Sequence, residues 1–66
     1  MKTLYPNITV KLTGTDGNAF AVLGRVLAAM KKGGVSDDER ATFVKEATAK
    51  GYENLLATVM RYINVE

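Results

Sequence analysis

The sequence has 66 residues, a formal net charge of +2, and neither cysteine nor histidine. A chain of this length forms one small domain and buries only about 60% of the surface that its unfolded form exposes. Because composition excludes disulfides and the usual zinc sites, oligomerisation is the support that we expect for so small a core. The missing imidazole and thiolate groups also remove most small-enzyme chemistry. We therefore expect a protein that is not an enzyme and holds no metal or cofactor.

The charges and apolar runs narrow the class of protein further. Basic and acidic residues alternate along the second half of the chain, whereas a nucleic-acid footprint normally needs a concentrated basic stripe. No apolar run approaches the roughly 20 residues of a membrane span, and the first residues lack the pattern of a signal peptide. We expect a cytoplasmic protein that binds neither nucleic acid nor a membrane.

The first predicted element is a strand over residues 7–13. Apolar and polar side chains alternate along it, which is the period of a half-buried strand. Pro6 lacks the N–H group that a ladder uses, so it marks the beginning or an edge of this strand. Residues 1–6 are expected to form an N-terminal extension.

A central helix is predicted over residues 18–32, because Asn18 is a typical N-cap and the apolar residues after it have helical spacing. The helix is apolar over more than half of its circumference, so we expect it to be covered by the strand and by other helices or a second subunit. Gly24 costs about 1 kcal/mol relative to alanine inside a helix, which suggests that another backbone approaches it closely. Gly33 ends the helix as a residue able to turn left-handed.

The second helix is predicted over residues 36–50. Ser36 and Glu39 form a capping box, and the acidic residues between them suit the positive pole of a helix N-terminus. The apolar side of this helix is thin. We expect it to lie on the surface, with Glu46 and Lys50 paired one turn apart.

Apolar residues spaced by three and four predict a third helix over residues 52–60. For residues 61–65 a short closing strand is favoured over a continued helix, because the first strand otherwise has no partner for its backbone groups. The predicted fold class is α+β: a small single domain, β-α-α-α-β, with two short strands pairing against a helical layer. A two-stranded sheet keeps two open edges, which is a second reason to expect a homo-oligomer.

The turn before the first helix is the feature most informative about function. Its glycines and polar residues precede a helix N-terminus, where free amides attract phosphate or carboxylate groups. Capping and turn chemistry also explain these residue types, because the loop lacks the Gly-Lys-Ser/Thr ending of a Walker loop. Arg25 lies two turns after Asn18 on roughly the same face of the helix. The ligand-binding candidates are Thr13, Gly14, Thr15, Asp16, Gly17, Asn18, Ala19, Phe20 and Arg25.

Tyrosines and basic residues supply the candidates for an interface. Tyrosine offers flat apolar area with a hydrogen-bonding tip, and two basic residues on the outward faces of the strands would form a small rim. The interface candidates are Tyr5, Lys11, Arg61 and Tyr62. Tyr52, at the start of the third helix, is expected to pack over the core instead.

The run TDGNAFAVLGRV, preceded by Val10-Lys11-Leu12, resembles a group of short, uncharacterised bacterial and bacteriophage proteins. These share the strand, the Thr-Asp-Gly-Asn turn and the Leu-Gly-Arg helix. The resemblance extends from Val10 to Glu66 through the later positions Tyr52, Leu55, Leu56, Met60, Arg61 and Val65. It implies one intact domain with a closing strand after the third helix, and it carries no known activity or ligand.

Two functional hypotheses follow from these observations. The first is a self-associating, phage-encoded binding protein that holds a small anionic or nucleotide-type ligand at the start of the first helix. The alternative is a protein-interaction module that masks a partner protein through the apolar face of the first helix or through an open sheet edge.

Overall fold

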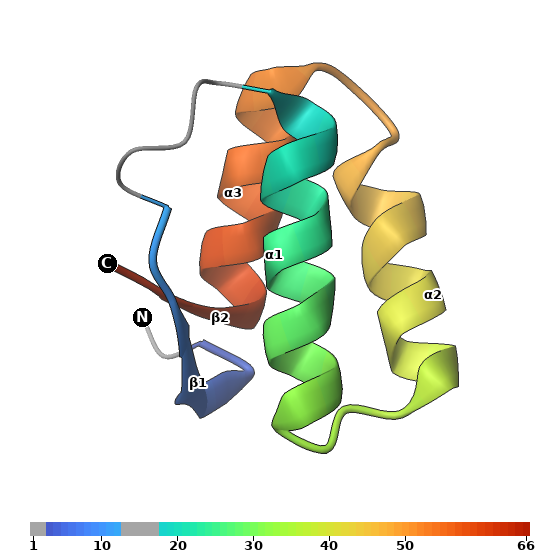
Figure 1. Cartoon of the computed structure of the whole chain (residues 1–66). Coiled ribbons are helices and arrows are strands. Elements are labelled where there is room, and N and C mark those ends of the chain that lie inside the picture. The colour runs from blue at the N-terminus through green and yellow to red at the C-terminus, as the bar shows by residue number, and fades with distance from the viewer. Residues whose placement is uncertain (1–2, 13–17) are drawn as a thin grey trace.

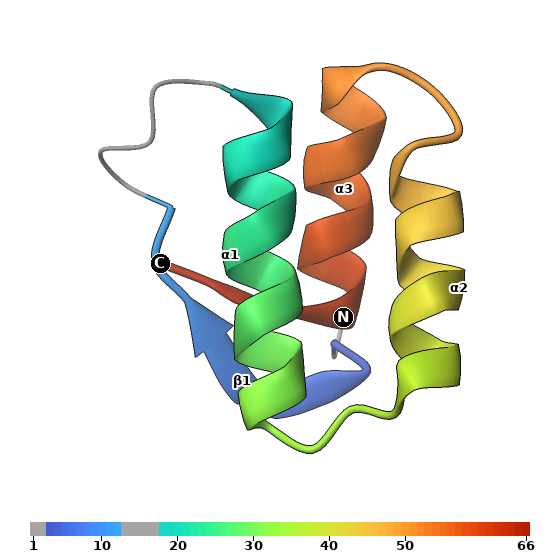
Figure 2. The same ribbon diagram turned by 45° about the vertical axis from the view of Figure 1, so that its right-hand side comes forward.

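The computed structural model describes residues 3–12 and 18–66 (Figure 1). Its elements in chain order are β1 (Tyr5–Val10), α1 (Ala19–Lys32), α2 (Asp37–Ala47), α3 (Tyr52–Tyr62) and β2 (Ile63–Val65). The predicted α+β domain with the order β-α-α-α-β is confirmed. Figures 1 and 2 show three helices running side by side, with β1 on the side of α1 that faces away from α2.

The two strands come from opposite ends of the described chain. They are parallel, with the register Tyr5 to Ile63, Thr9 to Asn64 and Val10 to Val65. Backbone hydrogen bonds extend the pairing beyond both strands, from Leu4 N–H to Arg61 O (3.0 Å) and from Leu12 N–H to Glu66 O (3.3 Å). Parallel strands need a long crossover connection, and the three helices supply it.

The bounds of β1 differ from the prediction at both ends. The strand begins at Tyr5, so the expected extension over residues 1–6 is wrong for its last two residues. It ends at Val10, short of the predicted residue 13, which lies outside the described residues. Pro6 lies inside the strand where the register is irregular. There Asn64 Nδ2 donates to the Pro6 carbonyl at 2.6 Å, so a side chain bonds to the strand where the ladder is interrupted.

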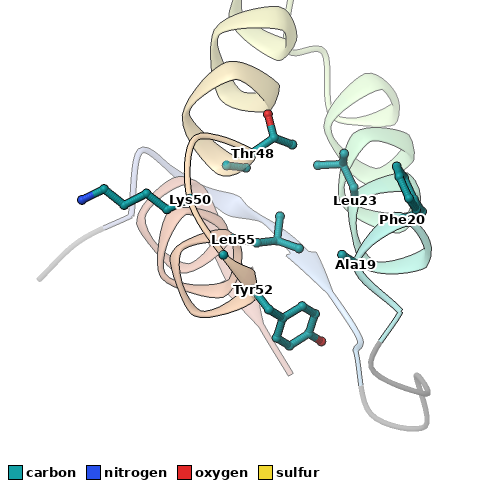
Figure 3. Close-up of a pocket in the computed structure, with 9 residues that line it drawn as sticks. Ala19, Phe20, Leu23, Thr48, Lys50, Tyr52 and Leu55 are labelled. Atoms are coloured by element: carbon teal, nitrogen blue, oxygen red, sulfur yellow. The ribbon is translucent and has the colours of Figure 1, made fainter.

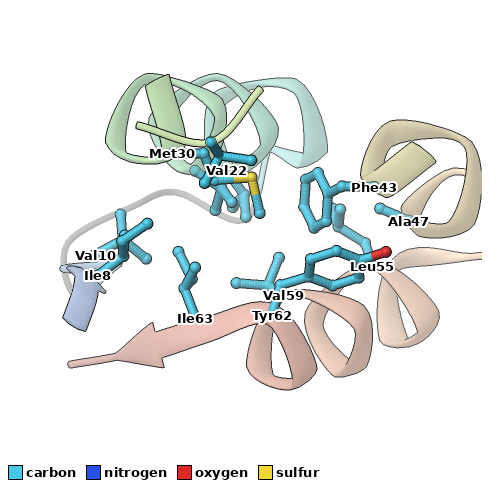
Figure 4. Packing of buried hydrophobic residues seen from close by; sticks show 12 residues of the cluster. Ile8, Val10, Val22, Met30, Phe43, Ala47, Leu55, Val59, Tyr62 and Ile63 are labelled. Carbon is cyan, nitrogen blue, oxygen red and sulfur yellow. The ribbon is translucent and has the colours of Figure 1, made fainter. Parts of the chain in front are cut away.

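The hydrophobic core lies between the sheet and the inner faces of the helices (Figure 4). Each element contributes the residues that its own periodicity places on one side. The buried apolar residues are Ile8, Val10, Val22, Val26, Met30, Val35, Phe43, Ala47, Leu55, Val59, Tyr62 and Ile63. On α1 the buried positions recur every fourth residue, at Val22, Val26 and Met30. Beside this stripe Leu23, Leu27 and Ala29 are partly buried against the core, whereas Phe20 stays at the surface.

The end of α1 corrects the role predicted for Gly33. Gly33 has a φ of −83°, and the left-handed residue is Gly34, with a φ of 90°. The amides after the helix close a Schellman motif, with Val35 N–H bonded to Met30 O at 2.9 Å and Gly34 N–H to Lys31 O at 3.2 Å. A side chain at Gly33 is disfavoured by crowding: a Cβ there would lie 2.6 Å from Ile8 Cδ1, so the Ile8 side chain would have to shift.

The role predicted for Gly24 is wrong. A Cβ at this position would meet no heavy atom within 4 Å among the described residues. The residue lies on the exposed side of α1, so no backbone of residues 3–12 or 18–66 requires a glycine there.

α2 is shorter than the predicted 36–50 because its last carbonyls are capped by other groups. It ends at Ala47, with Thr48 Oγ1 donating to the Val44 carbonyl at 2.7 Å. Asn54 Nδ2, from α3, donates to the Glu46 carbonyl at 2.8 Å. Lys50 lies beyond the helix, so the expected pair with Glu46 is wrong. The Glu46 carboxylate instead lies 3.5 Å from Arg61 Nη2.

The closing segment contains both structures that the sequence left open. α3 continues to Tyr62, two residues past the predicted end, and β2 begins at Ile63. The helix continues because Leu55, Val59 and Tyr62 share one buried face. Residues 61 and 62 are therefore helical, and the predicted strand over 61–65 is confirmed only for its last three residues.

Replacing Gly33 by alanine is expected to destabilise the domain by about 1–2 kcal/mol, the usual cost of overpacking a filled site. The added methyl group would overlap Ile8 Cδ1 and Cγ1, which lie 2.6 and 2.7 Å from the ideal Cβ position. Urea unfolding followed by far-UV circular dichroism measures the change. An unchanged transition midpoint would show that the Ile8 side chain moves aside at no cost.

Replacing Gly24 by alanine is expected to have the opposite sign. The site is open and helical, so the substitution gains the difference in helix propensity, about 1 kcal/mol. The same unfolding measurement checks it, and Gly24→Ala serves as the matched control for Gly33→Ala. A loss of stability would contradict the open surroundings of Gly24.

Candidate functional site

Asn18 pairs with two of the amides at the start of α1, where an anion was expected to bind. Asn18 Oδ1 accepts hydrogen bonds from the N–H groups of Phe20 (2.9 Å) and Ala21 (3.4 Å). The Val22 N–H donates to the Asn18 carbonyl at 3.0 Å. Capping therefore explains Asn18. The other turn candidates, Thr13, Gly14, Thr15, Asp16 and Gly17, lie outside the described residues.

Arg25 approaches the chain just after β1. Its Nη1 atom donates to the Lys11 carbonyl at 3.4 Å, and both residues are exposed. Two cations predicted for different roles thus lie on the same side of α1. The expected rim of Lys11 and Arg61 is wrong, because Arg61 belongs to α3 and pairs with Glu46 of α2. The two extra helical residues bring the Arg61 side chain to Glu46 of α2, although the Arg61 carbonyl still accepts a hydrogen bond from Leu4 N–H beside the sheet.

Tyr62 is used inside the molecule. It is 7% exposed. Its ring meets Phe43 edge to face, with centroids 5.1 Å apart, and stacks with Tyr5 at 6.4 Å. Its hydroxyl donates to Glu46 Oε1. Tyr62 thus has little surface to offer a partner, which corrects its predicted interface role, and Tyr5 packs beside it at the edge of the core.

The surroundings of the Tyr62 hydroxyl favour its protonated form. The hydrogen bond to the Glu46 carboxylate, followed by burial and the negative charge of Glu46, raises the pKa of Tyr62 from 10.0 to about 12. A tyrosinate at this position would lose its donor and face a carboxylate. The hydrogen bond between Tyr62 of α3 and Glu46 of α2 therefore requires the protonated hydroxyl, which an exposed tyrosine would lose at a lower pH.

A pH dependence follows from the raised pKa of Tyr62. Below pH 10 the tyrosine is protonated in both states, and the stabilisation is fully present. Between pH 10 and about 12 the unfolded chain releases this proton first, so the free energy of unfolding falls. Urea unfolding across this interval is expected to show a steeper loss for the wild-type chain than for Tyr62→Phe. Equal slopes would mean that Tyr62 titrates like an exposed tyrosine.

An apolar groove opens where the first turns of α1 and α3 meet the C-terminal end of α2 (Figure 3). We call it the α1–α3 groove. Its volume is about 190 Å³. It is lined by Ala19, Phe20, Leu23, Ala47, Thr48, Lys50, Gly51, Tyr52 and Leu55. Figure 3 shows Leu23 and Leu55 directed into the space between α1 and α3, whereas the Lys50 ammonium group points away from it.

Two aromatic side chains stand at the rim of this groove. Phe20 is 85% exposed and Tyr52 is 39% exposed. From the sequence, Phe20 was named as a candidate for binding an anion and Tyr52 was expected to pack over the core, so the groove was missed. The available signal was the wide apolar face of α1, on which Phe20 is left uncovered.

The chemistry of the groove is that of an apolar binding surface. Its lining is mainly aliphatic and aromatic, and Lys50 and Tyr52 carry its ionisable groups. Within the described part of the chain, no three acidic side chains gather as metal ligands. In the same residues, no helix combines the length and apolar character needed to cross a membrane.

Comparison with protein-family models, curated proteins and solved structures finds no match to this chain.

Proposed function

We propose that this chain is a non-enzymatic protein-interaction module that receives a bulky apolar side chain of a partner in the α1–α3 groove. The supporting observation is Phe20, which is 85% exposed beside an open apolar groove. Full burial of a phenylalanine side chain is worth about 1.5–3 kcal/mol. A partner that covers this corner gains that contribution and also fills the space between Leu23 and Leu55.

The size of the groove favours a side chain over a metabolite. Its volume of about 190 Å³ is smaller than the roughly 300–1,000 Å³ of typical small-molecule pockets. A nucleotide also needs partners for its phosphates, and Asn18 engages the amides of Phe20 and Ala21. One aromatic or branched aliphatic side chain needs neither the larger volume nor these amides.

The composition of the site matches the anatomy of protein interfaces. Aromatic anchors contribute most to binding when they enter a desolvated centre that is surrounded by polar contacts. Here Phe20 and Tyr52 supply the aromatic area, and Thr48 and Lys50 supply polar groups at the C-terminal side of α2. The arrangement suits one central anchor from a partner, with hydrogen bonds around it.

Binding of a small anion is the second candidate function, and it rests on Arg25. The contact of Arg25 with the Lys11 carbonyl holds its guanidinium against the segment after β1, and both residues are exposed. A phosphate-bearing ligand of the kind expected for a phage-encoded nucleotide-binding protein would find the Arg25 charge on this side of α1. The two candidate functions use different faces of the helix and are separable by experiment.

A peptide titration followed by amide chemical shifts tests the groove. A short peptide carrying one phenylalanine is expected to shift Leu23, Thr48 and Leu55, whereas the same peptide with alanine is not. Tyr52→Ala removes one wall and is expected to weaken binding about tenfold, or roughly 1.4 kcal/mol. Met60→Ala is the matched control, because Met60 is an exposed apolar residue of α3 outside the groove lining.

The anion candidate is tested by titrating nucleotides into the same samples. Shifts that centre on Arg25 and vanish in Arg25→Ala would support it. The groove function is contradicted if the phenylalanine peptide leaves the groove amides unmoved at high concentration, or if Tyr52→Ala and Met60→Ala weaken binding equally.

A further inference from the structure

We infer that the partner seated in the α1–α3 groove is a second copy of this chain, with Phe20 of each copy packed against the groove of the other. This inference rests on the proposed function and names its partner. It gives the symmetric pair one shared apolar centre, built from the first turns of α1 and α3.

The same small face carries both a projecting group and a hollow. Phe20 projects from the first turn of α1, and its 85% exposure shows that it does not fill the groove it borders. Leu23, Tyr52 and Leu55 line the adjoining hollow. A two-fold interface requires one patch to be complementary to itself, and a projection beside a hollow on one patch meets that requirement.

The exposed aromatic area covers about half of a small dimer interface. Aromatic side chains have about 150–250 Å² of burial each, so the exposed parts of Phe20 and Tyr52 offer roughly 200–250 Å² per copy. A specific interface needs about 1,000 Å² in total, or about 500 Å² from each partner. The two aromatics thus supply close to half of it, and the surrounding Ala19, Leu23 and Thr48 extend the patch.

The charges of the face allow two copies to meet. Lys50 carries the positive charge among the lining residues, and its ammonium group points away from the groove (Figure 3). The first turn of α1 carries no acidic residue, and Glu53 in the first turn of α3 lies outside the groove lining. Two identical faces therefore approach without placing like charges opposite each other at the centre, where an unpaired charge would cost most.

Sedimentation equilibrium over a wide dilution series tests the inference with the full chain. The wild-type protein is expected to show a monomer–dimer equilibrium, and Phe20→Ala is expected to weaken it by about tenfold or more. Met60→Ala, at another exposed apolar position, is expected to leave it unchanged. Because Phe20 is outside the core, Phe20→Ala keeps the fold, and its far-UV circular dichroism and unfolding midpoint verify this.

Nuclear Overhauser effects in a mixture of labelled and unlabelled chains locate the interface. Contacts between the Phe20 ring of one copy and Leu23 or Leu55 of the other are expected. A wild-type chain that stays monomeric at every concentration overturns the inference, and so does a dimer that survives Phe20→Ala. If the chain is monomeric but its groove still binds the phenylalanine peptide, the proposed function stands and only the identification of the partner as a second copy is overturned. Failure of both dimerisation and peptide binding overturns the proposed function as well.

Discussion

The parallel pairing of β1 with β2 is the constraint on which the rest of the structure depends. It joins residues separated by nearly the whole chain, with Glu66 N–H bonded to Val10 O at 2.9 Å and Leu12 N–H to Glu66 O at 3.3 Å. Because the strands are parallel, the chain between them must return to the same end of the sheet. Three helices make that return, and their packed faces bury Ile8 and Ile63 from the two strands.

The junction of α3 and β2 shows how this pairing sets local structure. Tyr62, the last residue of the helix, lies between Tyr5 of β1 and Phe43 of α2. Ile63 follows at once as the first residue of the strand and is fully buried. The helix cannot end earlier without removing Tyr62 from this cluster, and it cannot continue without removing Ile63 from the register with Tyr5. The helix and the strand, which the sequence alone left as alternatives for this segment, therefore both form, and they meet between Tyr62 and Ile63.

Features encoded within one turn of the chain were predictable, whereas among the features that join distant segments only the pairing of the two strands was predicted. The caps at Asn18 and Ser36 follow from the residue and its near neighbours, and both side chains accept the expected backbone N–H groups. The end of α2 depends on Asn54, which belongs to the next helix. The space at Gly33 is limited because Ile8, twenty-five positions earlier, lies against it. Such contacts leave no periodic signal, because they exist only after the elements have packed.

The candidate site was also missed by the sequence analysis because it joins residues from distant segments. The predicted anion site used the residues of one turn and the helix start after it, and the structure pairs the amides of Phe20, Ala21 and Val22 with the Asn18 side chain and carbonyl. The α1–α3 groove instead draws its lining from three helices, so no single stretch of sequence contains it. What the sequence did contain was an excess of apolar residues on α1. The structure shows where that excess remains, at Phe20 and its neighbours, while Val22, Val26 and Met30 enter the core.

The small size of the domain explains why a groove and an aromatic side chain remain at its surface. A chain of 66 residues has too little interior to bury every apolar side chain and also enclose a ligand pocket. Its helices therefore meet at their ends with a groove left open, and an aromatic side chain stands beside it. Covering that groove needs a surface, and a surface of matching shape belongs to another protein molecule more readily than to a metabolite. The shortage of interior that makes the fold marginal is thus also the physical reason to look for its function at an interface.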